Sequence, residues 1–291
     1  MSRITHRLLE AAQIEVFDEI TFQHSVLAQC ALPHRAPPED ARTWQRRQGK
    51  AVLHVQAGAA YHPRTGAFVE IGLPYGVRAR MVLMHLHSAA LKARSPVVEV
   101  GNSLTAFVRR VQCRAPTGPE LAVFKEQLTR LATATISLAV DYDEDRAVQI
   151  DTRIVGGMEL WFEKDARQRV LWPTTVRLSL DYYDSLAAHA VPLSERAIAA
   201  LAHSAMALDA YCWLAQRLHR VPVCGQRIGW QALHDQFGQG FTRLRAFRAF
   251  FLRQLQQVRI VYPDARLEVD AAGLTLRTSP PPVPRRMVLL G

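Results

Sequence analysis

The sequence is poor in lysine and cysteine and lacks a long hydrophobic run. Only four of its 36 basic residues are lysine, and its four cysteines are scattered without a Cys-x-x-Cys pair. Such scatter argues against a disulfide framework and a zinc ribbon, so reduced thiols are expected. The most apolar stretch, Leu131 to Val140, contains threonine and serine and falls short of the roughly 20 residues that span a bilayer. We therefore expect no membrane segment.

Several other signals are missing. The first 20 residues carry charges throughout and have no uninterrupted apolar core, so we expect no signal peptide and a cytoplasmic protein. No Gly-x-x-x-x-Gly-Lys-[Ser/Thr] motif supports ATP hydrolysis, and Gly238-x-Gly240 lacks the rest of a dinucleotide-binding fingerprint. The acidic run Asp141, Asp143, Glu144 and Asp145 offers ligands for a hard cation, but a solvated hairpin tip is the favoured interpretation. We expect no cofactor, no bound metal and no enzymatic activity.

What is abundant is apolar material and arginine. Of the 291 residues, 49% are hydrophobic, which is enough for a substantial core, and the length favours two domains. The formal net charge is +10, which favours a polyanionic partner, either nucleic acid or an anionic membrane surface. The preference for arginine has two interpretations that are compatible: a GC-rich coding sequence, and recognition of phosphate and guanine by a planar guanidinium.

The first 71 residues are interpreted as an irregular N-terminal arm. A short helix, His6 to Ala12, and two strands, Ala51 to Gln56 and Ala67 to Ile71, are expected in it. The prolines and arginines between Leu32 and Lys50 indicate a solvated arm or linker.

Residues 72–187 have the order helix, strand, helix, helix, strands, which is the order of a winged helix-turn-helix unit with an extended wing. We expect helices from Gly76, from Ser103 to Arg110 and from Pro119. We expect strands at Val97 to Val100, Thr133 to Val140, Val148 to Ile154, Met158 to Phe162 and Val176 to Leu180.

Residues 188–284 repeat this order, and 285–291 form a tail. We expect helices after an N-cap at Ser194 and at Ala205 to Arg220, Trp230 to Phe237 and Phe241 to Val258, and strands at Arg227 to Ile228, Arg259 to Tyr262, Arg266 to Val269 and Leu274 to Arg277. The turn Asp270 to Gly273 closes the last hairpin. The predicted fold class is α+β, with two tandem winged helix-turn-helix domains after the N-terminal arm.

The helix predicted from Phe241 carries the functional argument. Residues 241–259 contain five arginines and no acid. At 100° per residue, one apolar stripe contains Leu244, Phe247, Phe251, Leu255 and Val258. The opposite face contains Thr242, Arg245, Ala246, Ala249 and Arg253. Small residues beside arginines allow a helix to lie close to base edges while the guanidiniums reach guanine or phosphate.

Further residues are candidates for DNA contact around this helix. The shorter helix before the glycine turn would cross the DNA backbone, as in helix-turn-helix docking. Arg243 flanks the stripe, and Arg248 lies nearer the buried edge, where a structural role is expected. The remaining candidates in this domain are Arg227, Gln231, His234, Gln239, Arg266 and Arg277.

Charge is concentrated in this part of the chain. Residues 193–291 hold 13 arginines, no lysine and 6 acidic residues, a net charge of +7. This concentration favours DNA binding over a merely solvated helix. The first domain has a weaker version of the surface, for which DNA contact and a protein interface both remain open. Its candidates are Arg109, Arg110, Lys125, Thr129 and Arg130.

From residue 72 onward the sequence resembles a known family. Each matching stretch is weakly specific alone, but their order along the chain is specific. They are GLPYGVRAR (Gly72 to Arg80), VVEVGNSLTAFVRR (Val97 to Arg110), LSLDYYDSL (Leu178 to Leu186), ALDAYCWLAQRLHR (Ala207 to Arg220), IGWQALHDQFG (Ile228 to Gly238), RAFRAFFLRQL (Arg245 to Leu255) and VYPDARLEVDAAGLTLRTSPPPVP (Val261 to Pro284). In these stretches the chain resembles the plasmid-encoded RepA-type replication proteins.

The resemblance implies a bacterial plasmid replication initiator that binds repeated double-stranded sites at a plasmid origin through tandem winged helices. It also implies opening of an adjacent AT-rich segment and recruitment of host replication proteins. It leaves open three partners, which are a host replication initiator, a helicase and a second copy of the chain in a homodimer. It also implies that the protein is located at the plasmid or the nucleoid.

Two other functions remain as alternatives. A winged-helix transcriptional regulator without initiator activity would have the same DNA-binding features. A rolling-circle nickase would use His85 and His87 as metal ligands and Tyr182 or Tyr183 as nucleophile. That arrangement requires a strand, in which residues i and i+2 share a face, whereas the sequence around the two histidines is helical.

Overall fold

The structure is a computed structural model of the 291-residue chain, and it describes residues 4, 8–9, 20–62, 65–99, 103–112, 115–143, 146–152, 155–157 and 175–284. The chain forms two compact units. Unit 1 is discontinuous and consists of residues 1–34 and 190–291, and unit 2 consists of residues 35–189. The N-terminal arm expected over residues 1–71 is therefore divided between the two units. The short helix expected at His6 to Ala12 lies largely outside the described residues.

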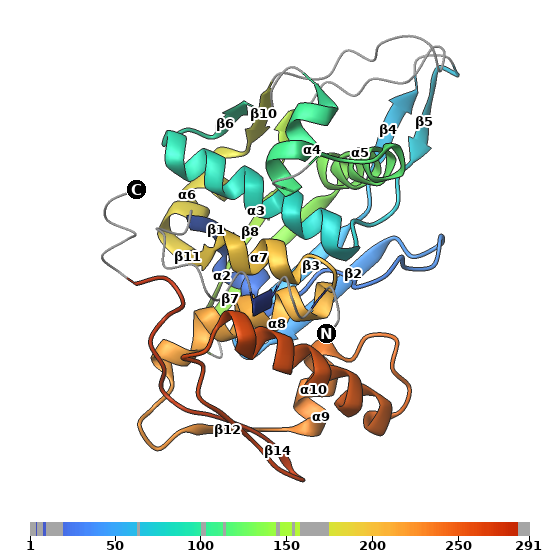
Figure 1. The fold of residues 1–291 in the computed structure, drawn as a ribbon. Coiled ribbons are helices and arrows are strands. Elements are labelled where there is room, and N and C mark those ends of the chain that lie inside the picture. The colour runs from blue at the N-terminus through green and yellow to red at the C-terminus, as the bar shows by residue number, and fades with distance from the viewer. Residues whose placement is uncertain are drawn as a thin grey trace. The chain divides into compact units, whose positions relative to one another are not determined.

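Unit 1 begins with a strand that pairs with a distant segment. β1 (Ile20–His24) pairs antiparallel with β11 (Ala190–Ser194), and α2 (Ser25–Gln29) follows β1. The later elements are α7 (Glu195–Leu201), α8 (Ala205–Arg217), the 3-10 helix η1 (Leu218–Arg220), β12 (Gln226–Gly229), α9 (Trp230–Phe237), α10 (Leu244–Val261), β13 (Leu267–Val269) and β14 (Gly273–Leu276) (Figure 1). The three last strands form one antiparallel sheet in the order β12-β14-β13.

The core of unit 1 is aromatic and surrounds α8, most of which is buried. Trp213 of α8 packs edge-on against Phe237 of α9 with ring centroids 5.4 Å apart, and Phe237 packs against Phe251 of α10 at 5.3 Å. Ser194 caps α7, as predicted, by accepting a hydrogen bond from the backbone N–H of Ala197 at 3.2 Å. These contacts fix α9 and α10 against α8 and so define the position of the two helices and the turn between them within the unit.

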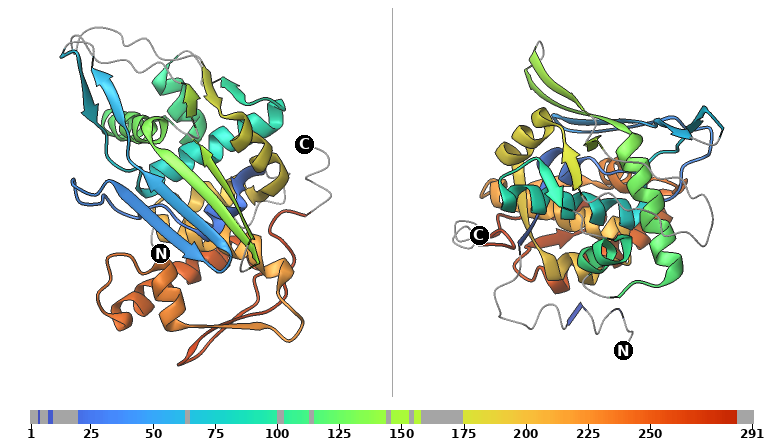
Figure 2. Two further views of the ribbon diagram at one scale, coloured as in Figure 1. Left: turned by 180° about the vertical axis from the view of Figure 1, so that it is seen from behind. Right: turned by 90° about the horizontal axis from the view of Figure 1, so that it is seen from above.

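Unit 2 contains a four-stranded antiparallel sheet and a smaller three-stranded one. The large sheet has the order β2-β3-β7-β8, and Figure 2 shows these strands side by side. The small sheet has the order β6-β10-β9, and β4 and β5 form a separate hairpin. The strands are β2 (Thr43–Gln48), β3 (Ala51–Gln56), β4 (Ala59–His62), β5 (Ala67–Glu70), β6 (Val97–Glu99), β7 (Thr135–Asp143), β8 (Arg146–Thr152), β9 (Val155–Gly157) and β10 (Thr175–Leu178).

Four helices complete unit 2: α3 (Gly76–Ala93), α4 (Leu104–Gln112), α5 (Gly118–Thr133) and α6 (Leu180–His189). Thr117 and Glu120 form a capping box at the start of α5, in which the Glu120 carboxylate accepts from the Thr117 backbone N–H at 2.9 Å. The phenol of Tyr182 on α6 lies 2.7 Å from Nε2 of buried His87 on α3. This pair connects α6 to α3 inside the core of the unit.

The two units share one arrangement of elements. In unit 1 the order is α8, β12, α9, α10, β13, β14, and in unit 2 it is α3, β6, α4, α5, β9, β10, with β7 and β8 inserted before β9. In both cases the first strand pairs with the third and the third with the second. The α+β class and the repeated order of elements predicted from the sequence agree with this structure.

Three sequence predictions were wrong in detail. The stretch Leu32 to Lys50, expected as a linker, contains β2 at its end, because exposed residues alternate with half-buried ones along an edge strand. Of the strand expected at Arg259 to Tyr262, the first three residues are the last turn of α10 and Tyr262 caps it, since Pro263 disfavours a helical conformation in the residue before it. Leu180, expected to end a strand, begins α6. The strand expected at Met158 to Phe162 lies outside the described residues.

Candidate nucleic-acid interface

The turn between α9 and α10 is closed by glycine and histidine. Gly240 has a φ of +78°, a conformation that favours glycine, and a Cβ at Gly238 would lie 2.5 Å from the His234 carbonyl oxygen. Nε2 of His234 lies 2.8 Å from the Phe241 carbonyl oxygen, and its ring packs edge-on against Phe247. His234, expected to contact DNA, is thus engaged in closing the turn.

α10 presents opposite faces to the core and to solvent. Its buried residues are Phe247, Phe251, Gln254, Leu255 and Val258. The residues exposed on and beside the other face are Thr242, Arg243, Arg245, Ala246, Ala249 and Arg253, as the helical periodicity predicted. Leu244 was expected in the buried stripe but is 40% exposed, because it is the first residue of the helix and no turn precedes it.

The exposed arginines of this face are available to a ligand. Within the part of the chain that the structure describes, the guanidiniums of Arg243 and Arg245 have no hydrogen-bond or ion-pair partner. Arg253 packs its guanidinium over the Phe250 ring at 5.4 Å. The small side chains of exposed Ala246 and Ala249 do not project between the arginines, so the helix backbone is accessible there. The face is therefore cationic, free of acids and accessible to a flat or grooved polyanion.

Two residues of α9 and the turn that were expected to contact DNA make side-chain hydrogen bonds within unit 1. The Gln231 side chain donates to Asp235 Oδ1 at 2.8 Å. The Gln239 side-chain oxygen accepts the backbone N–H of His34 at 2.8 Å. These intramolecular hydrogen bonds fix the turn and the first helix, and they are in place without a ligand.

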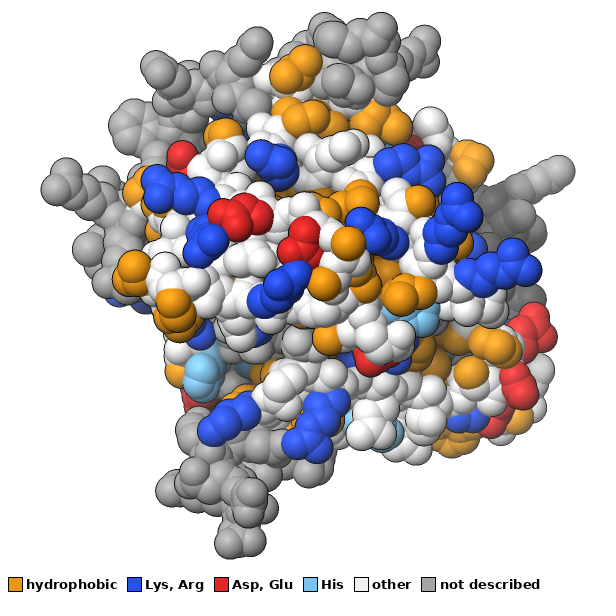
Figure 3. Space-filling model, turned by 90° about the horizontal axis from the view of Figure 1, so that it is seen from below, with side chains coloured by type: hydrophobic (Ala, Val, Ile, Leu, Met, Phe, Trp, Pro, Cys, Tyr) orange, Lys and Arg blue, Asp and Glu red, His pale blue; other side chains and the backbone are white. Residues whose placement is uncertain are grey.

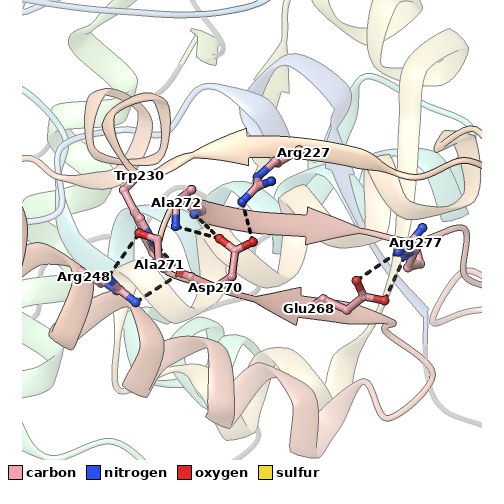
Figure 4. Close-up of polar contacts among 9 residues, drawn as sticks. Arg227, Trp230, Arg248, Glu268, Asp270, Ala271, Ala272 and Arg277 are labelled. Atoms are coloured by element: carbon pink, nitrogen blue, oxygen red, sulfur yellow. Dashed lines mark hydrogen bonds and ion pairs between the residues drawn. The ribbon is translucent and has the colours of Figure 1, made fainter.

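Arg248 of α10 connects this helix to Trp230 of α9 and to the β13-β14 turn, as Figure 4 shows. Its guanidinium lies over the Trp230 ring at 4.8 Å and donates to the carbonyl oxygens of Asp270 at 3.2 Å and Ala271 at 3.5 Å. The Trp230 indole N–H donates to the same Asp270 carbonyl at 3.2 Å. The structural role expected for Arg248 agrees with this geometry.

Two arginines at the β12-β14-β13 sheet are paired with acids. Arg277 and Glu268 form a doubly hydrogen-bonded pair, with both N–O distances 3.0 Å, and Arg227 pairs with Asp270 (Figure 4). The side-chain hydrogen bond from Arg277 lowers the pKa of Glu268 below its usual range. Arg266 is exposed beside them. Sequence reasoning identified these arginines but did not foresee the pairing, because it depends on the register of the strands that bring the partners together.

The candidates in unit 2 form a weaker set. Arg130 of α5 is engaged with Glu126 at 2.9 Å, with the Leu73 carbonyl oxygen at 3.0 Å and with the face of Tyr75. The Thr129 hydroxyl donates to the Lys125 carbonyl oxygen within the same helix. Arg109 and Arg110 are exposed, but they lie on α4. The structure therefore does not gather these cations on α5 in the way that it gathers those of α10.

Figure 3 shows a face of the molecule on which basic side chains are spread widely and acidic ones lie among them. Within the described residues, no group of three or more His, Cys, Asp or Glu side chains is arranged to hold a metal ion. The side chains of Asp141, Asp143, Glu144 and Asp145 lie outside the described part of the structure. A search of the described helices finds none with the length and hydropathy of a membrane span.

The sequence profile of the plasmid-encoded RepA proteins matches residues 73–232, which is more than half of the chain. The chain belongs to the plasmid-encoded RepA protein family. The match runs from the start of α3 to the first turns of α9, so the arginine-bearing face of α10 lies beyond it. The geometry of α10 is thus evidence that is independent of the family assignment.

Other comparisons concern the fold of this RepA-family chain. A comparison with curated proteins gives no match. Two crystal structures of domains 2 and 3 of RctB are similar to it, each with a TM-score of 0.51. The first has 11% sequence identity and covers 80% of this chain and 83% of its own; the second has 10% identity and covers 86% and 94%. At this identity the similarity concerns the fold alone.

The histidine and tyrosine pairs of the nickase alternative are not arranged for metal-assisted nicking. His85 and His87 lie on α3, a helix, so their side chains project about 200° apart. Tyr182 is fully buried against His87, and burial raises the pKa of its phenol. A buried, protonated phenol is not accessible to a DNA phosphate, so these residues do not favour the nickase.

Proposed function

We propose that this RepA-family protein is a plasmid replication initiator that binds double-stranded sites at the plasmid origin, with α10 as the helix that reads the major groove. The family membership supports the role in plasmid replication. The observation that carries the DNA-binding mode is the acid-free face of α10, where exposed arginines flank Ala246 and Ala249.

The arrangement of elements supports winged-helix domains in both units, over residues 72–187 and 188–284. The order helix, strand, helix, helix, strand, strand is that of a winged helix-turn-helix, and both three-stranded sheets have the corresponding strand order. In such a unit the second helix of the helix-turn-helix enters the major groove and the first crosses the backbone. α10 and α9 would have these roles in unit 1.

Further parts of the proposal follow from this mode. We infer that the protein binds repeated sites, assists opening of an adjacent AT-rich segment and recruits host proteins, among them an initiator and a helicase. A homodimer is part of the proposal as a second assembly state. No catalytic step is required of the protein in this scheme, since binding energy alone distorts the DNA.

The experiment begins with footprinting on DNA that flanks the gene on its plasmid, followed by replication rescue. A plasmid with the footprinted segment should persist only in cells that supply the protein. The variant with Arg245→Ala and Arg253→Ala should lose both the footprint and the rescue. Equal binding by the wild type and this double variant would eliminate α10 as the reading helix.

The same experiment separates the regulator alternative, which has the same DNA-binding geometry. A protein that protects its own promoter and represses it, but never supports replication of the footprinted plasmid, is a winged-helix regulator. Loss of rescue in the double variant with retained footprint would show that the arginines act after DNA binding.

A further inference from the structure

The outward face of the β12-β14-β13 sheet combines arginines with carboxylates. By register, Arg227 of β12 and Glu268 of β13 both lie opposite Thr275 of β14, so the three residues share one face of the sheet. Alternation along the chain places Arg266 and Asp270 on the same side as Glu268. Arg227, Arg266, Glu268 and Asp270 are exposed. Five charged side chains, counting Arg277 after β14, therefore lie within one small sheet that is joined to the reading helix by Arg248.

Each nitrogen of the Arg277 guanidinium already donates a hydrogen bond, and three of its five N–H groups are used. Its Nε and one terminal nitrogen donate to the two Glu268 oxygens at 3.0 Å each, and the other terminal nitrogen donates to the Cys224 carbonyl oxygen at 3.1 Å. A guanidinium bound to a carboxylate in this parallel manner has the geometry that it would adopt on a phosphate. Glu268 thus occupies the place of a phosphate on Arg277.

Arg227 is occupied by Asp270, which also holds the hairpin turn. One Asp270 oxygen accepts the backbone N–H groups of Ala272 at 2.7 Å and Gly273 at 2.9 Å, and the other pairs with Arg227. These backbone hydrogen bonds, together with Arg227, lower the pKa of Asp270. The carboxylate is therefore ionised at neutral pH, and the tip between Asp270 and Gly273 carries no cation.

We propose that Asp270 and Glu268 are specificity-determining residues, which occupy Arg227 and Arg277 and thereby prevent the hairpin from adding sequence-independent phosphate contacts to DNA binding. This inference rests on the proposed function of α10. Contacts to phosphate raise affinity for every sequence, whereas contacts to base edges discriminate between sequences. With Arg227 and Arg277 occupied, the hairpin contributes less to non-specific binding, and the preference for the origin site depends on α10.

The test removes each carboxylate while keeping its shape. Asp270→Asn retains a side-chain oxygen for the Ala272 and Gly273 N–H groups, so the turn is preserved. Glu268→Gln leaves the turn untouched. The matched control is Asp264→Asn, because exposed Asp264 has the same charge but makes no ion pair within the described residues. Affinity is measured for a duplex with the footprinted site and for a scrambled duplex, over a range of salt concentrations.

Each of the two variants is expected to bind the scrambled duplex about threefold more tightly at low salt, with a salt slope steeper by about 0.9 for each additional phosphate that the protein neutralises. Affinity for the footprinted duplex should rise less, so the ratio of the two affinities falls. The variant that combines Asp270→Asn with Glu268→Gln should show both effects, and Asp264→Asn should leave the salt slope unchanged. A merely structural role would lower affinity for both duplexes.

The inference is overturned if Asp270→Asn and Glu268→Gln match Asp264→Asn in slope and in affinity ratio, or if they weaken binding to both duplexes. Circular dichroism shows whether each variant is folded, and Glu268→Gln decides the question if Asp270→Asn is not. Unchanged binding by the Arg245→Ala, Arg253→Ala variant refutes the proposed role of α10. Loss of binding in that variant together with control-like behaviour of the carboxylate variants refutes only the inference on the hairpin.

Discussion

The side-chain oxygen of Gln239 accepts a hydrogen bond from the backbone N–H of His34, a residue 205 positions earlier in the chain. The same segment is held at two further points. Nε2 of His34 lies 2.8 Å from the carboxylate of Asp209 on α8, and the Gln236 amide donates to the Gln29 carbonyl oxygen at 3.1 Å. The N-terminal segment of unit 1 therefore supports the turn that precedes α10.

This relationship predicts that Gln239→Ala changes stability more than recognition. Loss of the hydrogen bond to His34 should lower the free energy of unfolding by about 0.5–1.5 kcal/mol. Because this side chain is engaged with the N-terminal segment, the affinity for DNA should stay as in the wild type. Urea unfolding followed by circular dichroism, together with fluorescence anisotropy on the footprinted duplex, checks both statements. Weaker binding by the folded variant would show that Gln239 contacts DNA.

The small exposed alanines of α10 predict that a larger side chain at one of these positions will interfere with DNA binding. Ala249→Leu should leave stability nearly unchanged, because position 249 is exposed and leucine is a good helix former. It should weaken DNA binding, since the larger side chain would hold the helix away from base edges, and a specific interaction with a base contributes about 1–3 kcal/mol. Ala188→Leu, at an exposed position of α6 in unit 2, is the matched control. If both variants bind DNA as the wild type does, α10 does not approach base edges.

Arg243 and Arg245 are predicted to differ in what they contribute. Arg245→Ala should reduce affinity for the footprinted duplex by about 1–3 kcal/mol and affect the scrambled duplex less, as expected for a base contact. Arg243→Ala should weaken binding to both duplexes and reduce the salt slope by about 1. Arg220→Ala, an exposed arginine outside α10, should change neither. Identical effects of the two substitutions would contradict this division of roles.

His85 on α3 predicts a pH dependence of unit 2. Burial, with smaller effects from Arg110 and Lys92, lowers the pKa of His85 to about 4. An unfolded chain binds this proton near pH 6.5, so the stability that the neutral ring provides is present above pH 6.5 and is lost as pH falls toward 4. The loss amounts to at most about 3 kcal/mol.

His85→Gln should reduce this dependence, which urea unfolding at pH 7.5, 6 and 5 would measure. The variant's absolute stability is not the readout, because His85 also packs edge-on against Phe107 at 5.4 Å. An NMR titration in which the His85 ring has its midpoint near 6.5 would contradict the prediction.

Local patterns in the sequence predicted most of unit 1 between Ser194 and Leu276. α9 was predicted with the bounds that the structure shows, because Gly229 and Gly238 lie at its two ends and the apolar periodicity between them is regular. The exposed face of α10 also follows from periodicity alone. The burial of Gln254 within its apolar stripe does not, since the pattern considers only hydrophobic residues.

Features that depend on distant partners were not accessible from the sequence. β1 and β11 are short, and Pro192 interrupts the strand pattern of β11; they become strands by pairing with each other. The ion pairs of Arg227 and Arg277 with Asp270 and Glu268 depend on the register of three strands. The residues predicted to contact DNA therefore included two arginines that already have acidic partners in the folded protein.

The pairing of β1 with β11 has a consequence for synthesis of the protein. Residues 20–24 leave the ribosome long before residues 190–194, with which they pair. At about 5–20 residues per second, the early strand waits on the order of ten seconds or more for its partner. During this interval unit 2, whose residues 35–189 are all contiguous, is completed first. A nascent chain thus acquires last the part that contains α10, the helix for which we propose a role in DNA reading, and fragments released before the final third of translation would lack that helix.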